Sequence, residues 1–90
     1  MHIDMTANGN SATLTTSTPG DENGLVAVIV QVSGTFGGGT LALQLDLGSG
    51  FVTEYEWTAA GSRLFDLPAG CSYRFVLSEA TGANLDIEVR

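Results

Sequence analysis

Apolar and polar residues alternate along most of the chain from Leu25 to Arg90, and the alternation is interrupted only by turns that contain glycine. In Thr40–Leu47 (TLALQLDL) the leucines would all point to one side of an extended chain, and Ala42, Gln44 and Asp46 to the other. Successive side chains of a β-strand point to opposite faces, so a period of two predicts half-buried antiparallel strands rather than helices.

The alternating segments predict six strands, with turns of glycine, proline or asparagine between them. The expected strands are Leu25–Ser33, Thr40–Leu47, Phe51–Trp57, Ser62–Leu67, Cys71–Glu79 and Asn84–Arg90. A seventh, conditional strand lies in Ser11–Thr16, where it would dock on a neighbouring chain or on its own sheet. This spacing predicts an all-β fold, a small antiparallel β-sandwich of the jelly-roll or immunoglobulin-like type with six to seven strands.

Two of these strands carry sharper expectations. Leu25–Ser33 is largely apolar on both faces, which predicts a central strand that is covered on both sides. In Phe51–Trp57, strict alternation would place Phe51, Thr53, Tyr55 and Trp57 on one face, with Trp57 in the core. A pair of acidic side chains, Glu54 and Glu56, would then share the opposite, solvated face.

The domain organisation follows from composition. Ninety residues are enough for one domain with one core. Residues 1–20 are small and polar with few apolar anchors, and they are expected to form an N-terminal arm ahead of a β-sandwich domain in residues 21–90. The segment Asp21–Gly24 (DENG) is expected to be the turn between them.

The charge balance restricts the partners. Ten acidic residues face three arginines, there is no lysine, and the net charge is −7. Such a chain lacks the cations that nucleic acids and anionic membranes require, so we expect neither as a partner. We expect Arg63 and Arg74 to pair with the surplus carboxylates. The chain start carries no signal-peptide pattern and no apolar run long enough to span a bilayer, which predicts a soluble protein that is intracellular when synthesised.

No motif predicts catalysis, a metal or a cofactor. Gly34–Gly39 lacks the Lys-Ser/Thr and the helix of a phosphate-binding loop, and is expected to be a flexible connection between strands. His2 is the only histidine, and no partner in the sequence suggests a metal site. Cys71 cannot form an internal disulfide, which favours a reducing compartment, and is expected to be a small buried hydrophobe. We therefore expect a protein that is not an enzyme.

The chain resembles small structural proteins of tailed bacteriophages over residues 26–90. The matching features are Val32–Thr40 (VSGTFGGGT), Leu41–Gln44 (LALQ), Leu67–Gly70 (LPAG) followed by Tyr73-Arg74, and Ser78–Ala83 (SEATGA). The resemblance implies a β-sandwich that decorates or cements the capsid or sits in head fibres, often as a trimer. Where related chains often have a longer loop with a tryptophan, this chain has the short turn Gly48–Gly50.

We expect one of two functions. The first is a capsid decoration or cement protein that stabilises the head by contacting the major capsid protein or another virion protein. It would be located on the capsid surface after assembly in the host cytoplasm, as a homo-oligomer with a trimer favoured. Phe36 would either fold back over the core or contact a partner. The expected partner contacts are Thr13, Leu14 and Thr15 in the arm and Phe36, Gly37, Gly38 and Gly39 in the loop.

The alternative is a carbohydrate-binding or adhesion module of a phage fibre or tail. A binding module of this kind stacks an aromatic ring on the sugar, so it predicts that Trp57 or Tyr55 is exposed to solvent.

Overall fold

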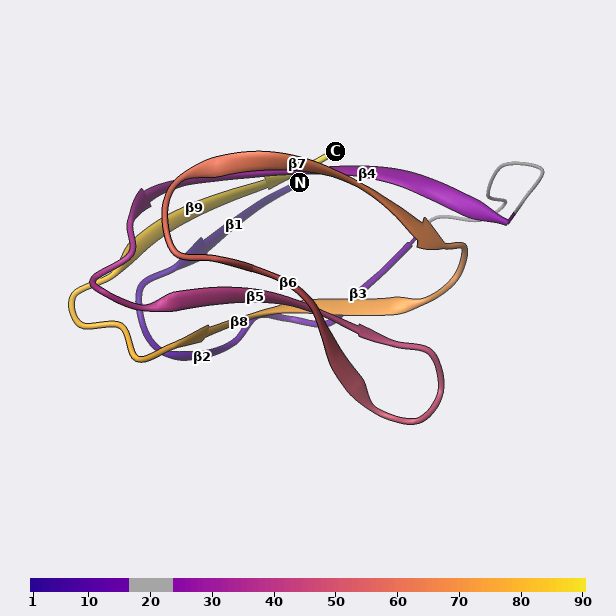
Figure 1. Ribbon diagram of the computed structural model, residues 1–90, viewed down its shortest axis with the longest axis horizontal. Coiled ribbons are helices and arrows are strands. Elements are labelled where there is room, and N and C mark those ends of the chain that lie inside the picture. Colours follow the sequence, from indigo (N-terminus) through magenta and orange to yellow (C-terminus); the bar gives the residue numbers. More distant parts are fainter. Residues whose placement is uncertain (17–23) are drawn as a thin grey trace.

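The computed structural model describes residues 1–16 and 24–90, and within these ranges the chain is all-β and contains no helix. Two antiparallel sheets pack face to face as a sandwich, seen as an upper and a lower layer in Figure 1. No helix in the described ranges is long and apolar enough to cross a membrane. The predicted fold class, a small antiparallel β-sandwich, is therefore confirmed.

Each sheet combines strands from both ends of the chain. The first sheet has the order β1-β9-β4-β7, and its strands are β1 (His2–Met5), β9 (Asn84–Val89), β4 (Leu25–Thr35) and β7 (Gly61–Pro68). The second has the order β2-β8-β5-β6, with β3 also paired to β8, and its strands are β2 (Gly9–Asn10), β8 (Ser72–Ser78), β5 (Thr40–Asp46), β6 (Phe51–Trp57) and β3 (Leu14–Thr15). Within the described ranges, the chain crosses between the two layers at β1–β2, β4–β5, β6–β7, β7–β8 and β8–β9.

All six strands predicted from Leu25 onward are present, with bounds that differ by at most two residues at an end. Three more short strands lie in the segment that we expected to be a polar arm, so residues 1–16 are part of the sandwich. The conditional strand is found at Leu14–Thr15, docked on its own sheet. The expected Asp21–Gly24 turn falls mostly outside the described residues, as does the end of the arm.

The core is built from the inward-facing residues of both sheets. The largest fully buried side chains are Phe75, Leu41, Leu43, Leu67, Leu77, Leu85, Ile87, Val30 and Val32. They come from β4, β5, β7, β8 and β9, of which β5, β8 and β9 have the clearest alternation in the sequence. Burial of a side chain of this size contributes roughly 1.5–3 kcal/mol, so these residues supply most of the force that holds the layers together.

The central strand β4 differs from its prediction. It lies between β9 and β7 as expected, but only its inner face is covered, because the described residues form no third layer. Ile29 on the outer face is 49% exposed, whereas Val28 and Val30 beside it are buried. The apolar residues on both faces of β4 thus correspond to a central position in the sheet, with one face in the core and the other forming an apolar part of the outer surface.

A β-bulge in β6 overturns the expected orientation of its aromatic residues. Leu43 lies opposite Tyr55 but Gln44 lies opposite Thr53, so Glu54 is an extra residue without a partner across the strand pair. An extra residue inverts the alternation. Tyr55 therefore faces the core side, whereas Thr53 and Phe51 face outward. The prediction that Phe51, Thr53, Tyr55 and Trp57 share one face is wrong.

The same bulge separates Glu54 from Glu56 and changes the end of the β5–β6 hairpin. Val52, opposite Leu45, lies on the core-facing side of β6 near the end of the hairpin, and its side chain is 68% exposed there. Leu47, which we expected to point inward at the end of its strand, lies beyond β5 and is 70% exposed. This hairpin projects away from the first sheet at the lower right of Figure 1.

Candidate functional site

The N-terminal residues that we expected to contact a partner are held against the chain's own second sheet. Leu14 lies opposite Tyr73 and packs against the core, while Thr13 and Thr15 on either side are exposed. Thr16 is buried, and its hydroxyl donates to the carbonyl of Pro68 (2.7 Å) and accepts from the amide of Cys71 (2.9 Å).

The side chains of Asn8 and Ser11 also hold the residues that precede Leu14 in place, which was not predicted from the sequence. Ser11 accepts a hydrogen bond from the amide of Phe75 at its Oγ (2.9 Å) and donates its own amide to the Phe75 carbonyl (2.7 Å). Asn8 bonds both the amide and the carbonyl of Ala80 with its side chain (2.8 and 3.0 Å). A tract of Asn, Ser and Thr can be read as unstructured, but such side chains also bind backbone groups, and here they do so.

The loop between β4 and β5 gives Phe36 the first of its two expected positions. Phe36 is 8% exposed and belongs to the hydrophobic core cluster, so its ring is not offered to a partner. The loop crosses between the sheets and is closed by a hydrogen bond from the Gly39 amide to the Phe36 carbonyl (3.0 Å). Gly37 and Gly39 pack against residues 78–81, and Gly38 is the exposed glycine of the three. The expected flexible connection is a tightly packed one.

The aromatic residues of β6 close one side of the sandwich. Trp57 is 5% exposed and packs edge-on against Tyr55 (4.8 Å between ring centroids) and Phe65 (5.8 Å). The guanidinium of Arg63 lies 4.4 Å from the centroid of the half-buried Tyr55 ring, where it makes a cation–π contact. A sugar-stacking tryptophan, which the carbohydrate-binding alternative needs, is therefore absent from the described surface, and Tyr55 is covered on one side.

Both arginines that we expected to pair with carboxylates contact rings instead. Besides Arg63 on Tyr55, Arg74 places its guanidinium 4.0 Å from the centroid of Phe51 and donates from Nε to the Gln44 side chain (2.9 Å). Among the described residues, neither arginine forms an ion pair with a carboxylate. The bulge explains Arg74, because it moves Phe51 onto the outer face of the second sheet, where Arg74 lies.

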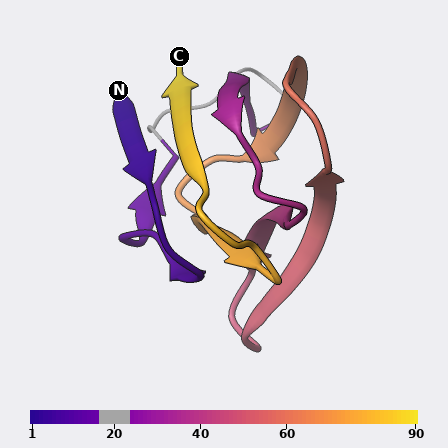
Figure 2. The ribbon, with the colours of Figure 1, turned by 90° about the vertical axis from the view of Figure 1, so that its left-hand side faces the viewer.

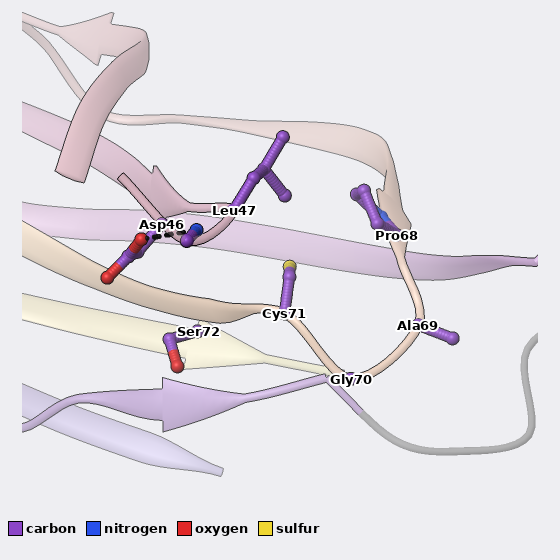
Figure 3. A pocket seen from close by; sticks show the side chains of 8 residues that line it. Asp46, Leu47, Pro68, Ala69, Gly70, Cys71 and Ser72 are labelled. Carbon is purple, nitrogen blue, oxygen red and sulfur yellow. Dashed lines mark hydrogen bonds between the residues drawn. The ribbon is translucent and has the colours of Figure 1, made fainter. Parts of the chain in front are cut away.

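A cleft of about 370 Å³ lies beside Cys71, and Figure 3 shows the thiol directed into it near Leu47 and Pro68. The thiol is buried, as expected, and the Thr16 hydroxyl is 3.9 Å from Sγ. Asp46 contributes the carboxylate among the lining residues, and one of its oxygens already accepts from the amides of Gly48 (2.8 Å) and Gly50 (3.1 Å). The described lining therefore holds no base that faces the thiol.

His2 meets three carboxylates on the outer face of the first sheet, which nothing in the sequence indicated. Antiparallel pairing sets His2 opposite Glu88 and Asp4 opposite Asp86. Nδ1 of His2 lies 2.7 Å from Glu88, and Nε2 lies 2.7 Å from Asp4 and 3.5 Å from Asp86. Because both ring nitrogens are engaged with carboxylates, we interpret this group as an ion-pair cluster rather than a metal site. The pairing of strands 86 residues apart creates it.

The cluster shifts the protonation of its members. Hydrogen bonds to Glu88 and then to Asp4 raise the pKa of His2 above its ordinary value. Hydrogen bonds with Asp86 and then with His2 lower the pKa of Asp4. All four side chains are partly exposed, at 37–64% of their surface, so the cluster is open to solvent and to protons.

Exposed apolar side chains form two surfaces. On the outer face of the first sheet, Ile29 (49% exposed) lies directly opposite Leu64 (60% exposed). At the end of the β5–β6 hairpin, Leu47 and Val52 border a groove of about 240 Å³ that is also lined by Leu45, Ser49, Gly50 and Glu54. Contiguous exposed apolar residues of this kind are typical of surfaces that bind other proteins.

Comparisons of the chain with models of protein families, with curated proteins and with solved structures found no match. Taken together, the described residues offer two apolar surfaces and an ion-pair cluster, with the aromatic rings turned inward or covered.

Proposed function

We propose that the protein is a non-enzymatic structural component of a tailed-phage virion, a capsid decoration or cement protein that stabilises the head by binding the major capsid protein. The proposal is supported by the resemblance of Val32–Thr40 and Ser78–Ala83 to phage structural proteins and by the β-sandwich fold on which those segments lie.

The observation that carries the proposal is the exposure of large apolar side chains on two surfaces. About half or more of each side chain is exposed for Ile29 and Leu64 on one surface and for Leu47 and Val52 on the other. Exposure of apolar area to water is unfavourable, and a partner that covers this area would relieve the free-energy cost. A small protein whose described clefts lack converging acid and base groups, but whose surface is apolar in patches, is suited to adhesion.

The charge supports a place on the outside of a shell. A net charge of −7 without lysine disfavours contact with packaged DNA and suits a surface that faces solvent. Among the described residues, no strand pairs with the outer edges of β6 and β7, and association of copies, as in the trimer that we favour, would cover such edges.

The contacts that we propose differ from the residues expected from the sequence. Leu14 and Phe36 pack on the core, so we assign the capsid contact to Ile29, Leu64, Leu47 and Val52. Thr13 and Thr15 stay exposed and can border such a contact.

The test is co-sedimentation of the purified protein with heads of its own phage assembled without it. The wild type is expected to sediment with the heads. Ile29→Ser combined with Leu64→Ser, or Leu47→Ser with Val52→Ser, is expected to weaken binding about tenfold or more, since removal of two apolar contacts costs 1–2 kcal/mol or more. A Ser62→Ala/Thr53→Ser variant, changed at exposed polar positions, is the control. Wild-type protein that stays in the supernatant would contradict the proposal.

A further inference from the structure

The strand β1 is attached to the sandwich by a small set of interactions. Its strand partner is β9, on whose free edge it lies, with Met5 buried and Ile3 packed against the core. At its start, the amide of Val89 donates to the carbonyl of Met1 (2.8 Å), and the N-terminal ammonium of Met1 donates to the carbonyl of Val89 (2.8 Å). Figure 2 shows this end of the molecule, where β1 runs beside β9. Because β1 has only four residues, each side-chain contact contributes a large fraction of the free energy that holds the strand on β9.

The geometry around His2 requires a particular protonation state. A neutral imidazole has one N–H donor and one nitrogen with a lone pair, whereas the imidazolium has two donors. Nδ1 and Nε2 both lie 2.7 Å from a carboxylate oxygen, of Glu88 and Asp4 respectively. Two contacts of this length with carboxylate acceptors need two N–H groups, so the observed arrangement is that of the imidazolium. A neutral ring would set a lone pair against one of the two carboxylates.

Charge acts in the same direction as the hydrogen bonds. The groups that face His2 are Asp4 on its own strand and Asp86 and Glu88 on β9, and all of them are acidic. Loss of the proton from His2 therefore removes the positive charge that separates three carboxylates. The two acidic residues of β9 would then face Asp4 of β1 with no charge to offset their repulsion.

We propose that His2 is a pH-sensitive latch, which fastens β1 to the edge of β9 when its ring is protonated and loosens the strand when the ring is neutral. Opening of the latch uncovers the edge of β9 and the apolar surface under Ile3 and Met5. The latch does not depend on the proposed capsid function. His2 lies on the same outer face of the first sheet as Ile29 and Leu64, but at the β1 edge of that sheet, and β7 with Leu64 forms the opposite edge.

The sign of the effect follows from the direction of the pKa shifts. Because the pKa of His2 is raised in the folded chain, its stabilisation of β1 is complete below the unperturbed value of 6.5 and is lost as the pH rises through the higher, folded value. The pKa of Asp4 is lowered from 3.8, so its contribution is lost as the pH falls below that value. Docking of β1 is thus strongest in mildly acidic solution.

Amide hydrogen exchange followed by NMR tests the latch, because two neighbouring amides report on different events. The amide of Val89 bonds to Met1 of β1, whereas that of Arg90 bonds to the carbonyl of Ile29 in β4 (2.9 Å). After correction for the intrinsic effect of pH on exchange, protection of Val89 is expected to stay level below about pH 6.5 and to fall as the pH rises above it, while that of Arg90 stays level throughout.

The size of the change is fixed by a second measurement. The fold-change in the opening of β1 must equal ten raised to the difference between the pKa of His2 in the docked strand and that of a free histidine, and NMR titration of the His2 ring gives that difference. His2→Asn is expected to abolish the pH dependence, and Glu88→Gln to lower the pKa of His2 and reduce the fold-change. Unchanged protection of Val89 across the range, an equal change at Arg90, or pH dependence that persists in His2→Asn would each overturn the latch.

Discussion

Glycine at position 37 shows how a single residue fixes the connection between the two sheets. Its backbone has a φ of 61°, in the left-handed region, and a Cβ there would overlap the carbonyl of Thr81. The amide of Thr81 also donates to the Gly37 carbonyl (2.9 Å), so the two loops are joined at this point. The neighbouring Gly38 has a φ of 75° but faces open space.

This contrast allows backbone conformation and close packing to be separated by experiment. Gly38→Ala has only the cost of a left-handed alanine, about 1 kcal/mol. Gly37→Ala adds the overlap with Thr81, and we expect it to lower the free energy of unfolding by about 2–4 kcal/mol. Urea denaturation of both variants measures the difference. Equal destabilisation by the two substitutions would show that the loops can separate without cost.

At the scale of single elements, the strands of the N-terminal segment depend on side-chain anchors. For β3, which has two residues, the anchor is the buried Thr16 that follows it. Its hydroxyl bonds the carbonyl of Pro68 and the amide of Cys71, so the segment is tied to the turn between β7 and β8.

Thr16→Val keeps the shape of the side chain but leaves these two backbone groups without their hydroxyl partner. Loss of a partner for a buried polar group costs about 1–3 kcal/mol, and we expect a decrease of that size in the free energy of unfolding. Thr15→Val on the exposed side of the same strand is the matched control and should change stability by less than about 0.5 kcal/mol. Thermal or urea unfolding of the pair gives the answer. If Thr16→Val is as stable as the control, the anchor has no energetic role.

The strands themselves could be predicted where alternation was strong, as in β5, β8 and β9, because burial of one face sets a period of two. The bulge at Glu54 could not, since an extra residue in one strand is determined by its partner and not by its own sequence. The strands β1 and β2 were missed for a related reason, and β3 was predicted only as the conditional strand in Ser11–Thr16. Apart from Ile3, Met5 and Leu14, their residues are polar or glycine, and their stability comes from pairing with β8 and β9 more than fifty residues away.

The ion-pair cluster was also beyond prediction from the sequence. No sequence pattern near His2 and Asp4 indicates that Asp86 and Glu88 lie beside them. Only the register of β1 on β9 brings the four residues together. By contrast, the buried states of Trp57 and Cys71 followed correctly from their phase in the alternation and from the small size of the core.

For the whole molecule, the N-terminal segment joins the two layers. β1 lies in the first sheet and β2 and β3 lie in the second, so residues 1–16 cover an edge of each. We expect that a chain without these residues loses its cooperative thermal transition or aggregates, because the edges of β8 and β9 and the core under Met5 are then exposed. Circular dichroism and gel filtration of the truncated chain test this. A monomeric, cooperatively folded truncation would show that the segment is a true arm.

The adjacency of residues 1 and 90 has a mechanical consequence. Both lie at the same end of the antiparallel pair β1–β9, where Val89 is bonded to Met1. Force applied between these two residues would break the hydrogen bonds of the pair one after another, and would separate β1 from β9 at low force. Force applied along the strands from opposite ends would instead strain many bonds at once, so the direction of pulling decides how firmly the protein holds.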